Sequence, residues 1–248
     1  METTLKEIPY KKIALKVGRI VGRVYTTTFE TQEVAVLKVD EITEEHTKLG
    51  SLSHPNIIPL LGYAARPPKS FRLILPYHYP YSLSQKLFSQ DYTVENGMCW
   101  AQEVCNGLVA LHSAGLLHLN LNLESVVFNQ EEHVVLTNMN CLTPEGITDT
   151  AESLPFVAPE ILAPTILADG TDEKPGKCAD IYSFGVLLFC LAEQKKPSII
   201  AEDKRETLSK EIPSKVAHLI KWCWKTDPLA RPQVIKEVSD NLEIALKP

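Results

Sequence analysis

A run of residues at 179–193, ADIYSFGVLLFCLAE, constrains the fold most, because it is apolar on every side of a helix. Such a helix is stable in water only where other elements surround it, so it predicts the centre of a mainly helical unit. Amphipathic helical patterns precede it at 94–115 and follow it at 216–225 and 234–246. Together these segments predict a large helical lobe.

The first third of the chain has the pattern of strands. Short runs at 31–40 and 71–77 are rich in Val, Ile, Leu and Tyr and are bounded by polar residues or by Pro and Gly. Between them, 41–52 has the composition of a short helix that ends before Pro55, since a proline disfavours helical geometry just before it. Two apolar runs at 125–138, split by a polar QEEH turn, predict a hairpin. The chain is therefore expected to be an α+β protein.

Composition excludes several functional classes. The formal net charge of −6 leaves no basic field for a phosphate backbone, so we expect no nucleic-acid partner. No stretch approaches the roughly 20 apolar residues that span a bilayer, and the start lacks the apolar centre of a secretion signal. The six cysteines form no CxxC pair and are interpreted as reduced core thiols. We expect a cytoplasmic protein without a membrane span.

Several strings resemble the protein kinase superfamily, above all its tyrosine-kinase-like branch, in order and spacing. They are HPNIIPLLGY (54–63), GLLHLNLNLESVVF (115–128), FVAPEIL (156–162), CADIYSFGVLLF (178–189) and DPLARP (227–232). The resemblance covers residues 16 to 240 and implies one two-lobed domain over 1–248. Its small β-rich N-lobe with one helix would occupy about 10–78, and its mainly helical C-lobe about 79–246.

The resemblance also implies contacts that hold the C-lobe together. Glu160 of the Ala-Pro-Glu triplet is expected to pair with Arg231, and Asp180 to accept hydrogen bonds from the backbone around His118. An unpaired buried charge costs several kcal/mol, so the presence of both Glu160 and Arg231 indicates that the lower lobe is maintained.

Uncharged residues stand where the family carries its catalytic groups. The loop pattern H-R-D-L-x-x-x-N is matched by residues 118–125, with Asn120 for the base Asp, Asn122 for the loop Lys and Ser125 for the metal-holding Asn. Asn138 opens the triplet that matches D-F-G. An amide cannot take up a proton at neutral pH, and it offers Mg²⁺ only a neutral carbonyl. The sequence therefore predicts a catalytically inactive homologue, a pseudokinase, with no metal site.

The nucleotide site is expected to be vestigial, because only the third glycine of the G-x-G-x-x-G loop remains. Two registers stay open at 34–39: either Lys38 faces the cleft and Val36 lies over the adenine site, or a one-residue slip puts Leu37 in the lysine's place. We favour the first, with Glu45 on the helix as the lysine's partner and Glu44 as its competitor. No tight binding of ATP or Mg²⁺ is expected. The residues implied for the site are Gly22, Val24, Val36, Lys38, Glu45, Leu75 and Tyr77.

A mostly apolar column is expected to link the lobes through Leu49, Leu60, Met139 and His118; the alternative is that these are ordinary core residues. Residues ahead of the Ala-Pro-Glu triplet are candidate phosphosites by resemblance, and an exposed polar loop without regulation is the alternative. These candidates are Thr148, Thr150 and Ser153.

A kinase fold without its chemistry is expected to act by contact, as a signalling scaffold, decoy or regulator of an active kinase or signalling complex. In kind it resembles integrin-linked kinase and the mixed-lineage kinase domain-like protein. Because the kinase pattern fills the chain, we expect a stand-alone protein without an effector domain. Two alternatives stay open: a weak or atypical kinase that recruits Glu124 or Asp149 for metal, and a metal-independent nucleotide-sensing switch.

Overall fold

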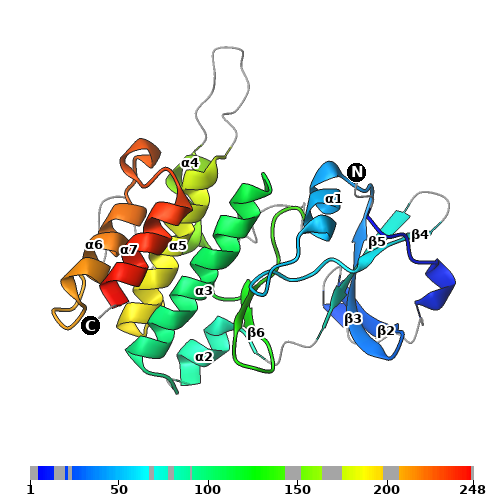
Figure 1. Ribbon diagram of the computed structural model, residues 1–248, viewed down its shortest axis with the longest axis horizontal. Coiled ribbons are helices and arrows are strands. Elements are labelled where there is room, and N and C mark those ends of the chain that lie inside the picture. The colour runs from blue at the N-terminus through cyan, green and yellow to red at the C-terminus, as the bar shows by residue number, and fades with distance from the viewer. Residues whose placement is uncertain are drawn as a thin grey trace, which may run out of the picture.

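Two lobes of different composition make up the fold in the computed structural model (Figure 1). A five-stranded sheet forms one lobe, long helices gather in the other, and a small hairpin lies between them in the view of Figure 1. The expected α+β class is confirmed. The structure describes residues 5–13, 20–21, 24–66, 70–77, 81–89, 91–142, 152–163, 175–197 and 207–246.

The sheet of the N-lobe is antiparallel, with strand order β1-β2-β3-β5-β4. The strands expected at 31–40 and 71–77 are present, whereas the alanine-rich fourth strand carried no strand signal in the sequence. The strand bounds are β1 Ile20–Val21, β2 Val24–Phe29, β3 Gln32–Val39, β4 Gly62–Arg66 and β5 Ser70–Pro76.

Strand β3 is buried on both of its faces. Val34 and Val36 belong to an outer apolar cluster that Ile8 and Ile13 cover, from the segment that contains the 3₁₀ turn η1 (Tyr10–Lys12). Leu37 and the next residue but one, Val39, belong instead to the main core. Successive side chains of a strand point to opposite faces of the sheet, so alternate residues of β3 pack in different apolar layers.

The predicted all-apolar helix is α5, and it lies at the centre of the C-lobe between α3 and α6. Gly185 allows the close approach of α6, because a Cβ at this position would lie 2.7 Å from the Cβ of Cys223. The helices are α2 Leu83–Ser89, α3 Val94–Ser113, α4 Pro159–Leu162, α5 Lys177–Glu193, α6 Ser214–Cys223 and α7 Ile235–Leu246, with 3₁₀ turns η2 Leu154–Phe156 and η3 Pro228–Ala230.

The two lobes are joined by helix α1 (Glu44–Ser51), the loop after it, and the hairpin of β6 (Val126–Phe128) and β7 (Val134–Leu136). The Asn56 side chain donates to the carbonyl of Val134 at 2.8 Å, and the Ile58 amide donates to that of Leu136 at 2.9 Å. Within the described ranges, no helix has both the length and the apolarity to cross a membrane.

Candidate functional site

The loop at 118–125 is held together by its own amide and hydroxyl side chains. Asn122 Nδ2 donates to the carbonyl and to Oδ1 of Asn120, at 3.0 and 3.2 Å, while Asn122 Oδ1 accepts the backbone amides of Glu124 and Ser125. The Ser125 hydroxyl lies 2.8 Å from the Asn122 amide that donates to it. All three side chains are at most 8% exposed, so their polar groups are occupied in fixing the loop.

Asn138 lies against this loop through its backbone. Its carbonyl accepts Asn120 Nδ2 at 2.8 Å, and its backbone is left-handed at φ 53°, which asparagine tolerates better than most residues. Its own side chain is exposed. The side chains of Asn120, Asn122 and Ser125 form these hydrogen bonds with amide, hydroxyl and carbonyl groups and not with carboxylates. Among the described residues, no cluster of three or more His, Cys, Asp or Glu is suited to hold a metal.

The strand lysine does not face the cleft, which corrects the favoured register. Lys38 is exposed and opposes Arg72 of β5, on the face that carries Val36. Leu37, on the other face, joins the core cluster that contains Leu49 of α1. The one-residue alternative is therefore the observed register, and Val36 lies in the outer apolar layer instead of over a nucleotide site.

Helix α1 turns a histidine inward where a glutamate was expected. Glu45 and its competitor Glu44 are both exposed, and Glu44 pairs with Lys48 on the helix surface at 2.8 Å. His46 is 2% exposed, and its Nε2 lies 2.7 Å from the carbonyl oxygen of Cys141. The expected pair of Lys38 and Glu45 thus has no counterpart among the described contacts, and sequence reasoning missed His46.

A buried carboxylate anchors the start of the loop to α5. Asp180 accepts the backbone amides of His118 and Leu119 at 2.9 and 2.7 Å, as the resemblance implied. It also accepts Nε2 of His112 at 2.8 Å, a partner that the sequence did not reveal. Burial works to raise the pKa of Asp180, but the hydrogen bond and charge of His112 outweigh it and the pKa is lowered. Burial lowers the pKa of His118 to about 4, so this ring is neutral at pH 7.

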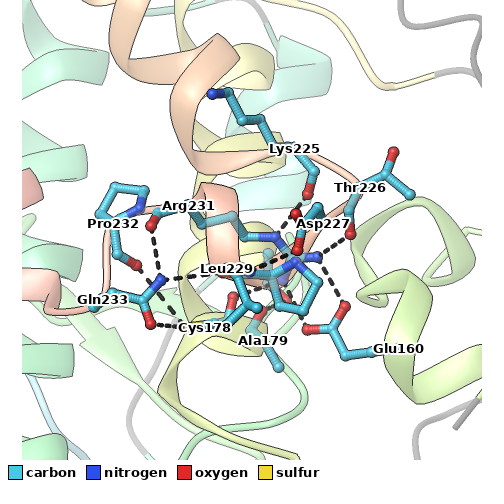
Figure 2. Close-up of polar contacts among 12 residues, drawn as sticks. Glu160, Cys178, Ala179, Lys225, Thr226, Asp227, Leu229, Arg231, Pro232 and Gln233 are labelled. Atoms are coloured by element: carbon cyan, nitrogen blue, oxygen red, sulfur yellow. Dashed lines mark hydrogen bonds and ion pairs between the residues drawn. The ribbon is translucent and has the colours of Figure 1, made fainter. Parts of the chain in front are cut away.

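The expected pair of Glu160 and Arg231 forms and has two parallel hydrogen bonds, of 2.7 and 2.8 Å (Figure 2). The Arg231 side chain is fully buried and also donates to the carbonyls of Cys178, Lys225 and Thr226. Its guanidinium lies over an aromatic ring of α5, 4.9 Å from the centroid. The pair therefore ties α4 to α5 and to the turn before α7.

The other residues implied for nucleotide binding are distributed unevenly. Leu75 is buried on the inner face of β5, opposite Ala35, and Tyr77 follows that strand with 42% exposure. Val24 is placed in β2 by its backbone register with Leu37. Gly22 lies outside the described residues.

Only one of the candidate phosphosites is described. Ser153 is 6% exposed and lines a small pocket with Asn120, Phe156 and Ile161, so in this conformation its hydroxyl is not presented to another enzyme. Thr148 and Thr150 lie outside the described residues, as does Asp149.

Comparison with known proteins decides the family. A model of the family described as "Protein kinase domain" matches residues 22–241. The chain belongs to this family. This kinase domain is 26% identical to a "Putative mitogen-activated protein kinase kinase kinase 7-like" protein of Drosophila melanogaster, over 89% of this chain and 62% of that protein.

Two further relatives show the same level of identity. "Serine/threonine/tyrosine-protein kinase HT1" of Arabidopsis thaliana is 26% identical, over 85% of this chain and 60% of that protein. "Mitogen-activated protein kinase kinase kinase 7" of Homo sapiens is 26% identical, over 92% of this chain and 41% of that protein. The kinase domain thus spans less than two thirds of the length of these relatives.

The comparisons correct one prediction from the sequence. We expected that the chain is not an enzyme, and this is wrong, because a protein kinase domain whose relatives are named as kinases points to an enzyme. The activity of this chain itself is a separate matter that the relatives' names do not show.

The residues expected in the interlobe column are all buried: Leu49, Leu60 and Met139 share the main apolar cluster, and His118 is fully covered.

Proposed function

We propose that this kinase domain works in cytoplasmic signalling through contact with a partner protein, as a scaffold, decoy or regulator. The expected partner is an active kinase or a signalling complex. The observation that carries the proposal is the hydrogen-bond network of Asn120, Asn122 and Ser125. Their buried side chains bond to one another, to the backbone of the loop and to the carbonyl of Asn138. The contacts of Glu160 with Arg231 and of Asp180 with the loop connect the elements of the lower lobe, which supports a folded binding surface.

We further propose that the domain does not bind ATP and Mg²⁺ tightly. The cleft side of β3 presents Leu37, which cannot donate to a phosphate, while Lys38 is on the far face. Asn138 offers a hard cation only a neutral amide oxygen, a weaker ligand than a carboxylate. Both features support weak nucleotide binding.

A second candidate function is a weak or atypical protein kinase, and the names of the relatives favour it. Glu124 is the one described acidic residue of the loop at 118–125; its side chain is exposed and its amide donates to Asn122. Such a kinase would transfer phosphate without a carboxylate at positions 120 and 138.

Thermal unfolding with ATP, and with ATP plus Mg²⁺, separates these functions. We expect no rise of the midpoint in either condition for the natural chain, and a metal-dependent rise for the double variant Asn120→Asp with Asn138→Asp. The single variant Asn129→Asp, in the hairpin turn, is the matched control. A metal-dependent rise in the natural chain, together with transfer of labelled phosphate to a protein substrate, would establish the atypical kinase instead. An equal rise with and without metal would indicate a nucleotide-sensing switch.

The contact function has its own test. The purified domain should form a stable complex with a kinase captured from cells, measured by size exclusion and light scattering with both proteins pure. Failure of every captured kinase to bind the pure domain would contradict the proposal.

A further inference from the structure

The ring of His46 contacts two different parts of the molecule. Its Nδ1 lies 3.0 Å from the backbone amide and 3.1 Å from the hydroxyl of Thr43, the residue that caps the N-terminus of α1. Its Nε2 lies 2.7 Å from the carbonyl oxygen of Cys141, which is 95 residues away in the chain. Both the ring and Cys141 are buried, at 2% and 8% exposure. One side chain therefore closes the helix cap and reaches the C-lobe.

These partners fix the protonation of the ring. The Thr43 amide can only donate, so Nδ1 must accept and carries no proton; the Cys141 carbonyl can only accept, so Nε2 must carry the proton. The neutral ring with its proton on Nε2 satisfies both contacts at once. A protonated ring would set an N–H against the N–H of Thr43 and break the cap.

The position of this contact gives it significance. Cys141 follows the triplet Asn138-Met139-Asn140, and Leu49, one helical turn after His46, packs in the same cluster as Met139. The lysine and glutamate expected to fix this helix both face solvent. The His46–Cys141 bond connects α1 directly to the segment at 138–142.

We propose that His46 is a positioning residue that holds α1 to the segment after residues 138–140, in place of a lysine–glutamate ion pair. The inference does not depend on whether the domain acts by contact or by phosphate transfer. Burial lowers the pKa of His46, while the hydrogen bond to the Cys141 carbonyl and the charges of Glu45 and Glu41 oppose that effect. The facing Cys141 thiol is neutral, since burial raises its pKa to about 12. As the pH falls through the lowered pKa of the ring, Nδ1 gains a proton and the bond from the Thr43 amide is lost, whereas Nε2 still carries its proton and keeps the bond to the Cys141 carbonyl.

The variant His46→Gln separates the two contacts. A glutamine at the third helical position can still bond to the capping residue's amide, as in an ordinary capping box, but then it does not reach the Cys141 carbonyl. Hydrogen exchange reports the result through the amides of Asn140 and Leu142, which are bonded to His118 and Met139 at 2.9 and 2.8 Å. We expect these amides to exchange about 3 to 10 times faster, as the loss of one buried hydrogen bond implies.

Two controls keep the test specific. The amides inside α1 should change less than about twofold, since the cap remains, and His218→Gln on the exposed face of α6 should change neither region. Unchanged exchange at 140–142 in His46→Gln, or a uniform increase over the whole sheet, would overturn the proposal.

The natural chain provides a second measurement. After correction for intrinsic rates, exchange of the Thr43 amide should rise as the pH is lowered through the pKa of the ring, while the amides at 140–142 stay protected because Nε2 still donates to the Cys141 carbonyl. A flat profile at Thr43, or loss of protection at 140–142 over the same pH range, would contradict the contacts assigned to the ring.

Discussion

Replacing Glu160 with Gln should destabilise the C-lobe strongly, because Arg231 would keep its buried charge and lose its anion. Loss of one partner from a buried ion pair costs about 3–5 kcal/mol. Glu160 is 23% exposed and three carbonyls still accept from Arg231, so we expect a smaller cost than this range, about 2–3 kcal/mol. For a chain of this size, the midpoint of thermal unfolding should then fall by about 4–12 °C.

Tryptophan fluorescence is a suitable assay, because the three tryptophans, Trp100, Trp222 and Trp224, all belong to the C-lobe. Unfolding in urea followed by this signal reports on the lobe that contains the ion pair. The control is Glu152→Gln, which removes an exposed partner of Lys196 at 3.6 Å and should cost less than about 1 kcal/mol. If Glu160→Gln were no more destabilising than this control, the carbonyls alone would suffice for Arg231 and the reasoning would fail.

Three further predictions concern the same lobe. Gly185→Ala should cost about 1–3 kcal/mol by forcing α5 away from α6. Gly176→Ala, with no atom within 4 Å of the added Cβ, should cost less than about 1 kcal/mol, the penalty for alanine at the N-cap of α5; urea unfolding compares the two. Asp180→Asn should cost about 3–5 kcal/mol at pH 7, because an amide cannot accept from all three donors. Since the pKa of this carboxyl is lowered, the excess cost over the natural chain should shrink only as the pH falls through that lowered pKa, which a series of unfolding curves from pH 7 downward measures. Because the folded pKa of His118 is about 4, its ring should make unfolding easier as the pH falls from 6.5 to 4, and His118→Phe should reduce this slope in a pH series of unfolding curves.

Much of the fold could be predicted because its long elements carry clear periodic patterns. The run that forms α5 is apolar all round, and the structure buries it as that pattern requires. The loop and the ion pair of Glu160 with Arg231 were accessible through the resemblance, since both depend on short strings with fixed spacing. Strand β4 escaped notice because alanine and glycine give little strand signal.

The register of β3 could not be read from the sequence. A strand with one wet face alternates polar and apolar residues, but VAVLKV is apolar on both faces. The structure explains this pattern, because Ile8 and Ile13 cover the face that would otherwise meet water. Both registers therefore bury similar side chains, and the position of Lys38 alone could not decide between them.

Helix α1 was misread for a related reason. Glu45 and His46 stand four and three residues before Leu49, and both spacings put a side chain on the face that Leu49 occupies. A charged residue was assigned inward on the family's pattern alone. The available signal was local: Thr43 followed three residues later by a side chain able to bond back to its amide.

Leu5 packs against Gly50 near the end of α1, so closely that a Cβ on this glycine would collide with the leucine side chain. The helix is thus held near both termini, by Leu5 of the N-terminal segment at one end and by the bond of His46 to Cys141 at the other. A change in the tilt of α1 would therefore have to break both contacts, and the loss of one alone should leave the helix in place.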